Sequence, residues 1–257
     1  MLLEVEESDI RGIINYLLRN KPSDLFLLDI AKYVVGKRRF DEAKSHDKID
    51  VSSSIEFVRN GAIEHNYSGM QRFSSIERTN RLIGPLCAID KVFFKANEMS
   101  VLSIGPRTEM ELLSLVAQGF DPDKIRGLDL ISYSPWIDLG NMHYMPYKDN
   151  TFDVVISGWV LGYSDNPELA CQEMLRVSKD DCIIAIGSTY VPEEQLPDQV
   201  PDVMRRKENK DEFLPKVDDL LSIFGDAVKN VYVRHDPESD DAIGRTIVIF
   251  DVCKGEI

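Results

Sequence analysis

The residues best placed to do chemistry lie between Ser100 and Ser188, where short apolar runs end in turns that carry polar side chains. The run Val101–Ile104 predicts a strand, which Gly105-Pro106 ends before an amphipathic helix that begins near Thr108. The next run, IRGLDL, predicts a second strand that closes on Asp129. A carboxylate there can accept hydrogen bonds from both hydroxyls of a ribose that lies over the first turn. The spacing therefore predicts a nucleotide-type pocket at the edge of a parallel sheet.

Strand and helix patterns alternate from Met99 onward, which is typical of a doubly wound, mostly parallel α/β sheet. The last two apolar runs have no helical pattern between them, so we expect an antiparallel hairpin at the sheet edge. We expect strands near 100–105, 124–129, 136–139, 152–157, 182–188, 228–234 and 246–252, and helices near 108–119, 166–177 and 212–224.

The first 98 residues have a different pattern and predict a helical accessory or cap segment, residues 1–98, before an α/β domain over residues 99–257. Apolar residues recur at helical spacing near 10–18 and 25–35, and the polar stretch 41–54 is the expected connection. Ser74 and Glu77 match a capping box for a helix toward Phe94, which Pro85 should kink or divide.

The composition excludes several function classes. A formal net charge of -14 argues against broad binding to nucleic acid or to an anionic membrane, which both require clustered Lys and Arg. The four cysteines are scattered, three of them in apolar runs, and the four histidines show no ligand spacing, so we expect neither disulfides nor a metal site. No apolar stretch is long enough to span a membrane, and no basic leader is present. The expected location is the cytoplasm.

A longer motif follows the second strand. It reads GNMHYMPYKDNTFDVV over Gly140–Val155, and it is similar to the run G-D-M-H-x-L-P-F-x-D-N-S-F-D-V-V of class I S-adenosylmethionine-dependent methyltransferases, in the methyltransferase type 11-like branch. The resemblance covers residues 99–188 well and 189–257 loosely, and residues 1–98 fall outside it. It implies a Rossmann-like sheet of seven strands with an antiparallel last strand. It also implies S-adenosylmethionine as cofactor and S-adenosylhomocysteine as product.

The family's cofactor contacts carry over onto this chain position by position. The first turn would pass under the methionine part of the cofactor, the end of the second strand would hold the ribose, the start of the long motif would border the adenine, and the end of the fourth strand would face the methyl donor. These residues are Gly105, Pro106, Arg107, Thr108 and Glu109; Asp129 and Leu130; Asn141 and Met142; and Ser157 and Gly158.

The first turn departs from the family pattern D/E-x-G-x-G-x-G, because only Gly105 remains. Arg107 and Glu109 stand at the second and third glycine positions, where they lack the freedom of glycine at positive φ. One reading is loss of cofactor binding. In the other, Arg107 meets the methionine carboxylate and Glu109 meets its ammonium, so that charge-assisted contacts replace backbone contacts.

A second departure is the short connection of eleven residues between Asp129 and Asn141, which is too short for a helix and a strand. The helix that normally follows the second strand would be deleted or reduced to a turn. One side of the adenine pocket would then be open, and we expect the N-terminal helices, or a partner chain such as a second copy in a homodimer, to cover it.

Candidates for the chemical step lie around the fourth strand. His143 is the candidate base, with a supporting or adenine-side position as the alternative, and Tyr163 is a second catalytic candidate. Trp159, Tyr163 and Tyr190 are candidates for binding the acceptor, with core packing as the alternative for Trp159. Arg205–Lys207 could recognise an anionic acceptor, or could simply be exposed.

The predicted function is an S-adenosylmethionine-dependent methyltransferase acting on oxygen of a small molecule or saccharide. Oxygen is favoured because the N-methylating signature D/N-P-P-Y/F is absent after the fourth strand, where Ser157-Gly158-Trp159-Val160 stands. The alternative is a catalytically inactive methyltransferase-like domain that serves as a protein-interaction scaffold, which the glycine-poor first turn favours.

Overall fold

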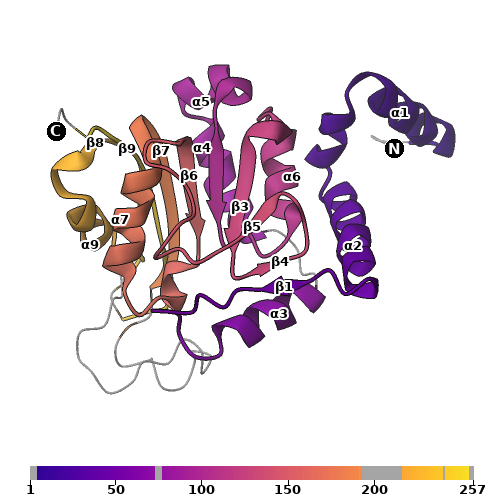
Figure 1. Ribbon diagram of the computed structural model, residues 1–257. Coiled ribbons are helices and arrows are strands. Elements are labelled where there is room, and N and C mark those ends of the chain that lie inside the picture. The colour runs from indigo at the N-terminus through magenta and orange to yellow at the C-terminus, as the bar shows by residue number, and fades with distance from the viewer. Residues whose placement is uncertain (1–4, 73–76, 191, 193–215, 240, 255–257) are drawn as a thin grey trace.

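A seven-stranded sheet forms the centre of the computed structural model, which describes residues 5–72, 77–190, 192, 216–239 and 241–254 (Figure 1). The spatial order is β5-β3-β2-β6-β7-β9-β8. The first five strands of this order are parallel, and β9 lies antiparallel to both β7 and β8. The strands are β2 (Val101–Ile104), β3 (Ile125–Asp129), β5 (Ile137–Leu139), β6 (Phe152–Gly158), β7 (Ser178–Tyr190), β8 (Val228–His235) and β9 (Gly244–Val252).

The sheet is buried because helices cover both of its faces, and this explains the continuous apolar runs of its central strands. All four residues of β2 are buried, and its side chains alternate between two hydrophobic clusters. One cluster joins the sheet to α2, α4, α5 and α6, and the other joins it to α7 and α9 (Figure 1). The helices are α1 (Glu7–Asn20), α2 (Asp29–Ser45), α3 (Ala62–Arg72), α4 (Glu77–Cys87), α5 (Asp90–Lys95), α6 (Glu109–Ala117), α7 (Pro167–Val177) and α9 (Val217–Phe224).

The predicted fold class is confirmed: a doubly wound, mostly parallel sheet of seven strands ends in an antiparallel hairpin. As predicted, no helix follows the second strand, and the connection from Asp129 to Asn141 holds only the two-residue strand β4 (Ile131–Ser132) and β5. Pro85 lies inside α4, which ends at Cys87, and the chain resumes helical structure at Asp90. Ser74 of the expected capping box and Arg205–Lys207 lie outside the described residues.

The expected polar connection over residues 41–54 is shorter than predicted, because α2 continues to Ser45. Two ion pairs at i,i+4 spacing support its last turns, Lys37 with Asp41 at 2.5 Å and Arg38 with Glu42 at 2.7 Å. The apolar pattern ended too early to reveal these turns, because only Phe40 and Ala43 are buried among their charged residues.

Residues 50–66, which we call the strap, run along the carboxyl ends of the parallel strands (Figure 1). At its start, β1 (Asp50–Val51) pairs antiparallel with β4, and the Ser52 amide donates to the Leu130 carbonyl at 2.8 Å. Further along, the Asp165 amide donates to the Phe57 carbonyl at 2.8 Å, and a bridge joins Val58 to Ser164. Backbone hydrogen bonds therefore hold the strap across the sheet edge, from the end of β3 to the loop after β6.

No helix in the described part of the chain is long and apolar enough to cross a membrane. Within the same residues, no group of three or more His, Cys, Asp or Glu side chains is arranged to hold a metal ion.

Trp159 shows how tightly the end of β6 is packed, and it provides a test of the fold. Its ring covers Gly187 of the neighbouring strand β7, where an added Cβ would lie 2.9 Å from the ring. We predict that Gly187→Ala lowers the free energy of unfolding by about 1–3 kcal/mol, because the core must shift to admit one methyl group. Urea unfolding measures this. Gly162→Ala is the control, since an added Cβ there meets no atom within 4 Å and should change stability by less than about 0.5 kcal/mol. Equal effects of the two changes would contradict this packing.

Candidate functional site

Asp129 is the centre of the polar groups at the carboxyl edge of the sheet. It ends β3 and is only 5% exposed. Its Oδ2 accepts a hydrogen bond from the Arg107 amide at 3.0 Å, and its Oδ1 accepts from Asn66 Nδ2 at 2.7 Å and from the Ile131 amide at 3.2 Å. Burial raises the pKa of this carboxyl group, while the hydrogen bonds from the Ile131 and Arg107 amides and the charge of Arg107 lower it. Asp129 thereby joins the first turn, the strap and β4.

The first turn has the shape that glycines usually provide, although only one glycine is present. Gly105 has a φ of 65° and Arg107 a φ of 57°. An added Cβ on Gly105 would lie 2.1 Å from Cγ1 of Val160, so this position requires glycine. Arg107 adopts the left-handed conformation at a cost of about 1–2 kcal/mol. The contacts that Arg107 makes therefore offset the free-energy cost of its left-handed conformation.

The Arg107 side chain turns toward α3. Its Nε donates to Asn66 Oδ1 at 2.9 Å, and its guanidinium lies against Gly69, where an added Cβ would be 2.6 Å from Nη1. Asn66 accepts from Arg107 with its oxygen and donates to Asp129 with its nitrogen. The amide of Asn66 thus fills the space between the two residues that resemblance assigns to the cofactor.

Glu109 begins α6, after Thr108 at the N-cap, and is buried. Its Oε2 pairs with Arg39 of α2 at 2.8 Å, and its Oε1 accepts a hydrogen bond from Ser134. The Glu109 amide donates to the Tyr133 hydroxyl at 2.9 Å, and burial is the main cause that raises the pKa of Tyr133. The carboxylate that was expected to meet the cofactor ammonium therefore has two partners within the chain.

Asn141 and His143 form a second polar cluster beneath the strap. Asn141 Nδ2 donates to the carbonyls of Ser54 at 3.2 Å and of Glu56 at 2.9 Å. Its Oδ1 lies 2.6 Å from His143 Nδ1, and His143 Nε2 lies 2.6 Å from Ser164 Oγ. This arrangement fits a neutral ring with its proton on Nδ1.

His143 does not lie at the pocket rim, which corrects the expectation that made it the best base. It is fully buried, both ring nitrogens have partners, and burial lowers the pKa of the imidazole while Asp165 opposes this shift. Its position is the supporting alternative: it fixes the turn of Asn141 and Met142 against the loop after β6. Met142 itself packs against the α7 side of the core.

Ser157 at the end of β6 and Trp159 just after it are both buried. Ser157 is fully buried, and its Oγ has no hydrogen-bond partner among the described residues. Trp159 is 7% exposed and belongs to the hydrophobic core, so the packing alternative describes it and the expected acceptor contact does not. Tyr163 follows in a short 3-10 helix, and its ring lies 5.5 Å from that of His65 of α3. Tyr190 ends β7, with Lys216 Nζ 5.8 Å from its ring centre.

The structure thus brings Gly105–Glu109, Asp129 and Asn141 to one edge and adds partners that the sequence did not reveal. These are Asn66, Arg39, Tyr133 and Ser164. Asn66 and Arg39 come from the N-terminal segment, where no motif marks them. Asn166 caps α7, because its side chain accepts a hydrogen bond from the Leu169 amide.

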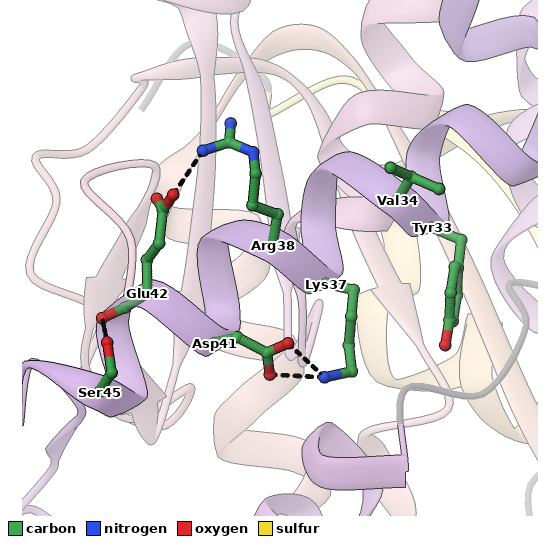
Figure 2. A pocket seen from close by; sticks show the side chains of 7 residues that line it. All are labelled: Tyr33, Val34, Lys37, Arg38, Asp41, Glu42 and Ser45. Atoms are coloured by element: carbon green, nitrogen blue, oxygen red, sulfur yellow. Dashed lines mark hydrogen bonds and ion pairs between the residues drawn. The ribbon is translucent and has the colours of Figure 1, made fainter.

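A different hollow of about 540 Å³ lies on the outer side of α2, lined by residues of that helix alone (Figure 2). Its charges pair with each other, Lys37 with Asp41 and Arg38 with Glu42. The residues that the resemblance assigns to the cofactor lie elsewhere, at the carboxyl edge of the sheet.

A cofactor made of a methionine tail, a ribose diol and an adenine requires backbone donors at a helix start, a carboxylate and a slot with one polar edge. Residues of these kinds stand at the matching positions, and Ser157 Oγ is a buried polar group without a partner among the described residues. The residues present therefore fit S-adenosylmethionine in kind. Asp129 and Asn141 are engaged by Asn66, Ser54 and Glu56, so a cofactor that used these groups would have to displace the strap.

Comparisons with known proteins indicate a fold and a partial family match. The methyltransferase domain family matches residues 123–186, which hold Asp129 and the whole long motif. A putative methyltransferase from Haloferax volcanii, solved in complex with the Trm112 methyltransferase activator, is 15% identical with a TM-score of 0.52, over 78% of this chain and 99% of that chain. The CurJ carbon methyltransferase is 10% identical with a TM-score of 0.51, over 98% of this chain and 72% of that chain. A search of curated protein sequences finds no significant match.

The sheet order and the motif after its second strand define a methyltransferase-type fold. Residues 123–186 are similar to the methyltransferase domain family, and the glycine-poor first turn lies outside this match.

The burial of His143 predicts a pH dependence of stability. Its pKa is lowered in the folded state, so below the ordinary value of about 6.5 the unfolded chain binds a proton that the folded chain excludes. The contribution is therefore fully present above that pH and is lost as the pH falls through the window toward the folded pKa. We predict that the free energy of unfolding falls less between pH 7.5 and 5.5 in His143→Gln than in the wild type.

Urea unfolding at the two pH values measures this, and the difference should approach about 1 kcal/mol. His235→Gln, which changes an exposed histidine, should leave the wild-type pH dependence intact. An unchanged pH dependence in His143→Gln would show that the imidazole titrates normally.

Proposed function

We propose that this protein transfers a methyl group from S-adenosylmethionine to an oxygen atom of a small molecule or saccharide. The observation that supports this most is the buried carboxylate of Asp129 at the end of β3, directly beside the strained first turn. Burying a carboxylate costs free energy, and this cost is offset only where the carboxylate holds structural elements together or binds a ligand. A scaffold role is not favoured, because it would require neither Asp129 nor the unpartnered Ser157 Oγ.

The residues that would hold the cofactor follow from their positions. Asp129 would hold the ribose, the turn from Gly105 to Glu109 would hold the methionine end, and Asn141 with Met142 would border the adenine. S-adenosylmethionine, when bound, supplies a methyl group on a positively charged sulfur, and S-adenosylhomocysteine remains as product. Ser157 and Gly158 end β6 beside β2 and would line the side from which the acceptor approaches.

Tyr163 is the residue that we propose to orient the acceptor. It follows β6, its backbone carbonyl accepts from the Arg59 amide of the strap at 3.0 Å, and its ring faces His65. A phenol can donate a hydrogen bond to an acceptor oxygen, or accept the proton that the oxygen loses. His143, which is buried with both nitrogens engaged, would hold Ser164 and so the loop that carries Tyr163.

Oxygen transfer rests on the residues after β6. Ser157-Gly158-Trp159-Val160 has neither the Asp or Asn nor the two prolines of the N-methylating signature D/N-P-P-Y/F, and Trp159 is turned into the core. The net charge of -14 favours a neutral or cationic acceptor over a polyanion.

The ribose carboxylate provides the most direct mutational test. We predict that Asp129→Asn weakens binding of S-adenosylmethionine and S-adenosylhomocysteine by about 10- to 100-fold, because one charge-assisted acceptor becomes a donor. Isothermal titration calorimetry measures this, and thermal unfolding confirms that the variant is folded. Asp123→Ala is the control, because Asp123 is an exposed carboxylate outside the site. Wild-type protein that binds neither ligand would overturn the enzyme proposal.

Substitution of Asn66 should change the affinity for the cofactor in the opposite direction. Because its amide occupies Asp129 Oδ1, we predict that Asn66→Ala raises the affinity for S-adenosylhomocysteine by about tenfold, which is the value of one modest hydrogen bond that no longer competes. Asn97→Ala, an exposed asparagine outside the site, should bind like the wild type. A weaker affinity in Asn66→Ala would make Asn66 a cofactor-binding residue instead of a competitor.

A further inference from the structure

Helix α1 presents an apolar surface that the rest of the described chain does not cover. It has 14 residues, and none of them is buried. Ile10, Ile13, Ile14 and Leu18 recur at helical spacing along one side, and each is between 43% and 58% exposed. Leu17 lies in the same stripe and is half-buried. Such a stripe is the pattern of a helix that packs against a partner.

The stripe continues beyond α1. The chain turns through the 3-10 helix η1 (Pro22–Leu27), which packs against α6, and then enters α2 (Figure 1). We call residues 5–46 the arm. Among the other exposed large apolar side chains of the arm, Tyr33 and Val34 line the α2 hollow of Figure 2 and Leu27, Leu28 and Ile30 precede them in the chain.

Within the arm, Phe40 and Ala43 anchor α2 in the core, whereas α1 buries no residue. An isolated helix shorter than about 12–15 residues is marginal in water, and most helical stability in proteins comes from packing an apolar face. In Figure 1, α1 stands at the margin of the molecule and away from the sheet. Its apolar face is therefore stable only when another surface covers it.

We propose that a second copy of this chain covers the arm, with the two α1 helices packed antiparallel about a two-fold axis. The charges of α1 fit this arrangement: Glu6, Glu7 and Asp9 stand at its start, and Arg19 and Lys21 at its end. Antiparallel pairing about the Ile13–Ile14 midpoint places the acidic end of each helix beside the basic end of the other. Ile10 of each helix then faces Leu17 of its partner.

The charge of the arm also favours a second copy of the chain over an anionic membrane as the partner. Residues 5–46 hold eight Lys and Arg against seven Asp and Glu, whereas the whole chain holds 30 against 44. Two nearly neutral arms do not repel each other, although two whole chains do. An anionic membrane requires a basic polar face, and the polar face of α1 carries both signs.

The arm is large enough for a stable contact. An interface of standard size involves about 20–30 residues on each partner, and the arm holds more residues than this. The same patch on both copies forms an isologous contact, which closes at the dimer. This inference does not depend on the proposed methyl transfer.

Light scattering after size-exclusion chromatography tests the proposal on the full chain. We expect the wild type to have a mass of twice 29.2 kDa, and Ile14→Asp to have the mass of the monomer at the same concentration. Phe93→Asp is the matched control, because it adds the same charge to an exposed apolar residue on α5, and it should remain a dimer. Far-ultraviolet circular dichroism confirms that Ile14→Asp keeps the α/β domain folded.

A charge exchange tests the antiparallel arrangement. Glu7→Lys and Arg19→Glu should each be largely monomeric, because like charges then meet at both ends of the helix pair. A mixture of the two variants should recover the dimer mass, since each mixed pair restores opposite charges at both ends. Failure of the mixture to recover dimers would overturn the antiparallel pairing.

A wild type that is monomeric at about 100 µM, well above micromolar affinities, would overturn the proposal. Binding of that monomer to phosphatidylserine vesicles, lost in Ile14→Asp, would also overturn it and would assign the arm to a membrane surface.

Discussion

The carboxylate of Asp129 is the interaction on which the rest of the site depends. It lies at the end of a buried parallel strand, where leaving a charge without partners is costly. Its three donors come from the first turn, from β4 and from α3. Because these donors lie far apart in the sequence, satisfying one carboxylate fixes the position of three elements. The left-handed conformation of Arg107 is explained in the same way, since its amide must reach Asp129 while its side chain reaches Asn66.

The strap gives this site a property that the parallel sheet alone would lack. Polar groups that a nucleoside cofactor would use are engaged within the chain: Asp129 by Asn66, and Asn141 by the carbonyls of Ser54 and Glu56. The short connection after β3 makes this possible, because β1 pairs with β4 where a helix would otherwise stand. Under the proposed function, cofactor binding would exchange hydrogen bonds rather than fill prepared donors and acceptors. Such an exchange lowers affinity by the cost of displacing the strap.

The sequence predicted the α/β domain well because its strands are buried on both sides and read as apolar runs separated by Gly and Pro. The seven strands, the antiparallel hairpin and the missing helix after Asp129 all followed from such runs and from their spacing. The site was predicted less completely. Asp129, Asn141 and the first turn were found by motif and resemblance, but their partners Asn66, Arg39 and Ser164 carry no motif and reach the edge only through tertiary packing. His143 and Trp159 were assigned to the pocket from their positions in the sequence alone, but the structure buries both side chains.

The central claim is that the strap and the cofactor compete for Asp129. Hydrogen–deuterium exchange with and without S-adenosylhomocysteine tests it most directly, because the Ser52 and Arg59 amides of the strap bond to residues of the sheet edge. The account predicts that the ligand increases exchange in residues 52–66 and decreases it in residues 105–109. Increased protection of both segments, or no change in either at saturating ligand, would contradict the account.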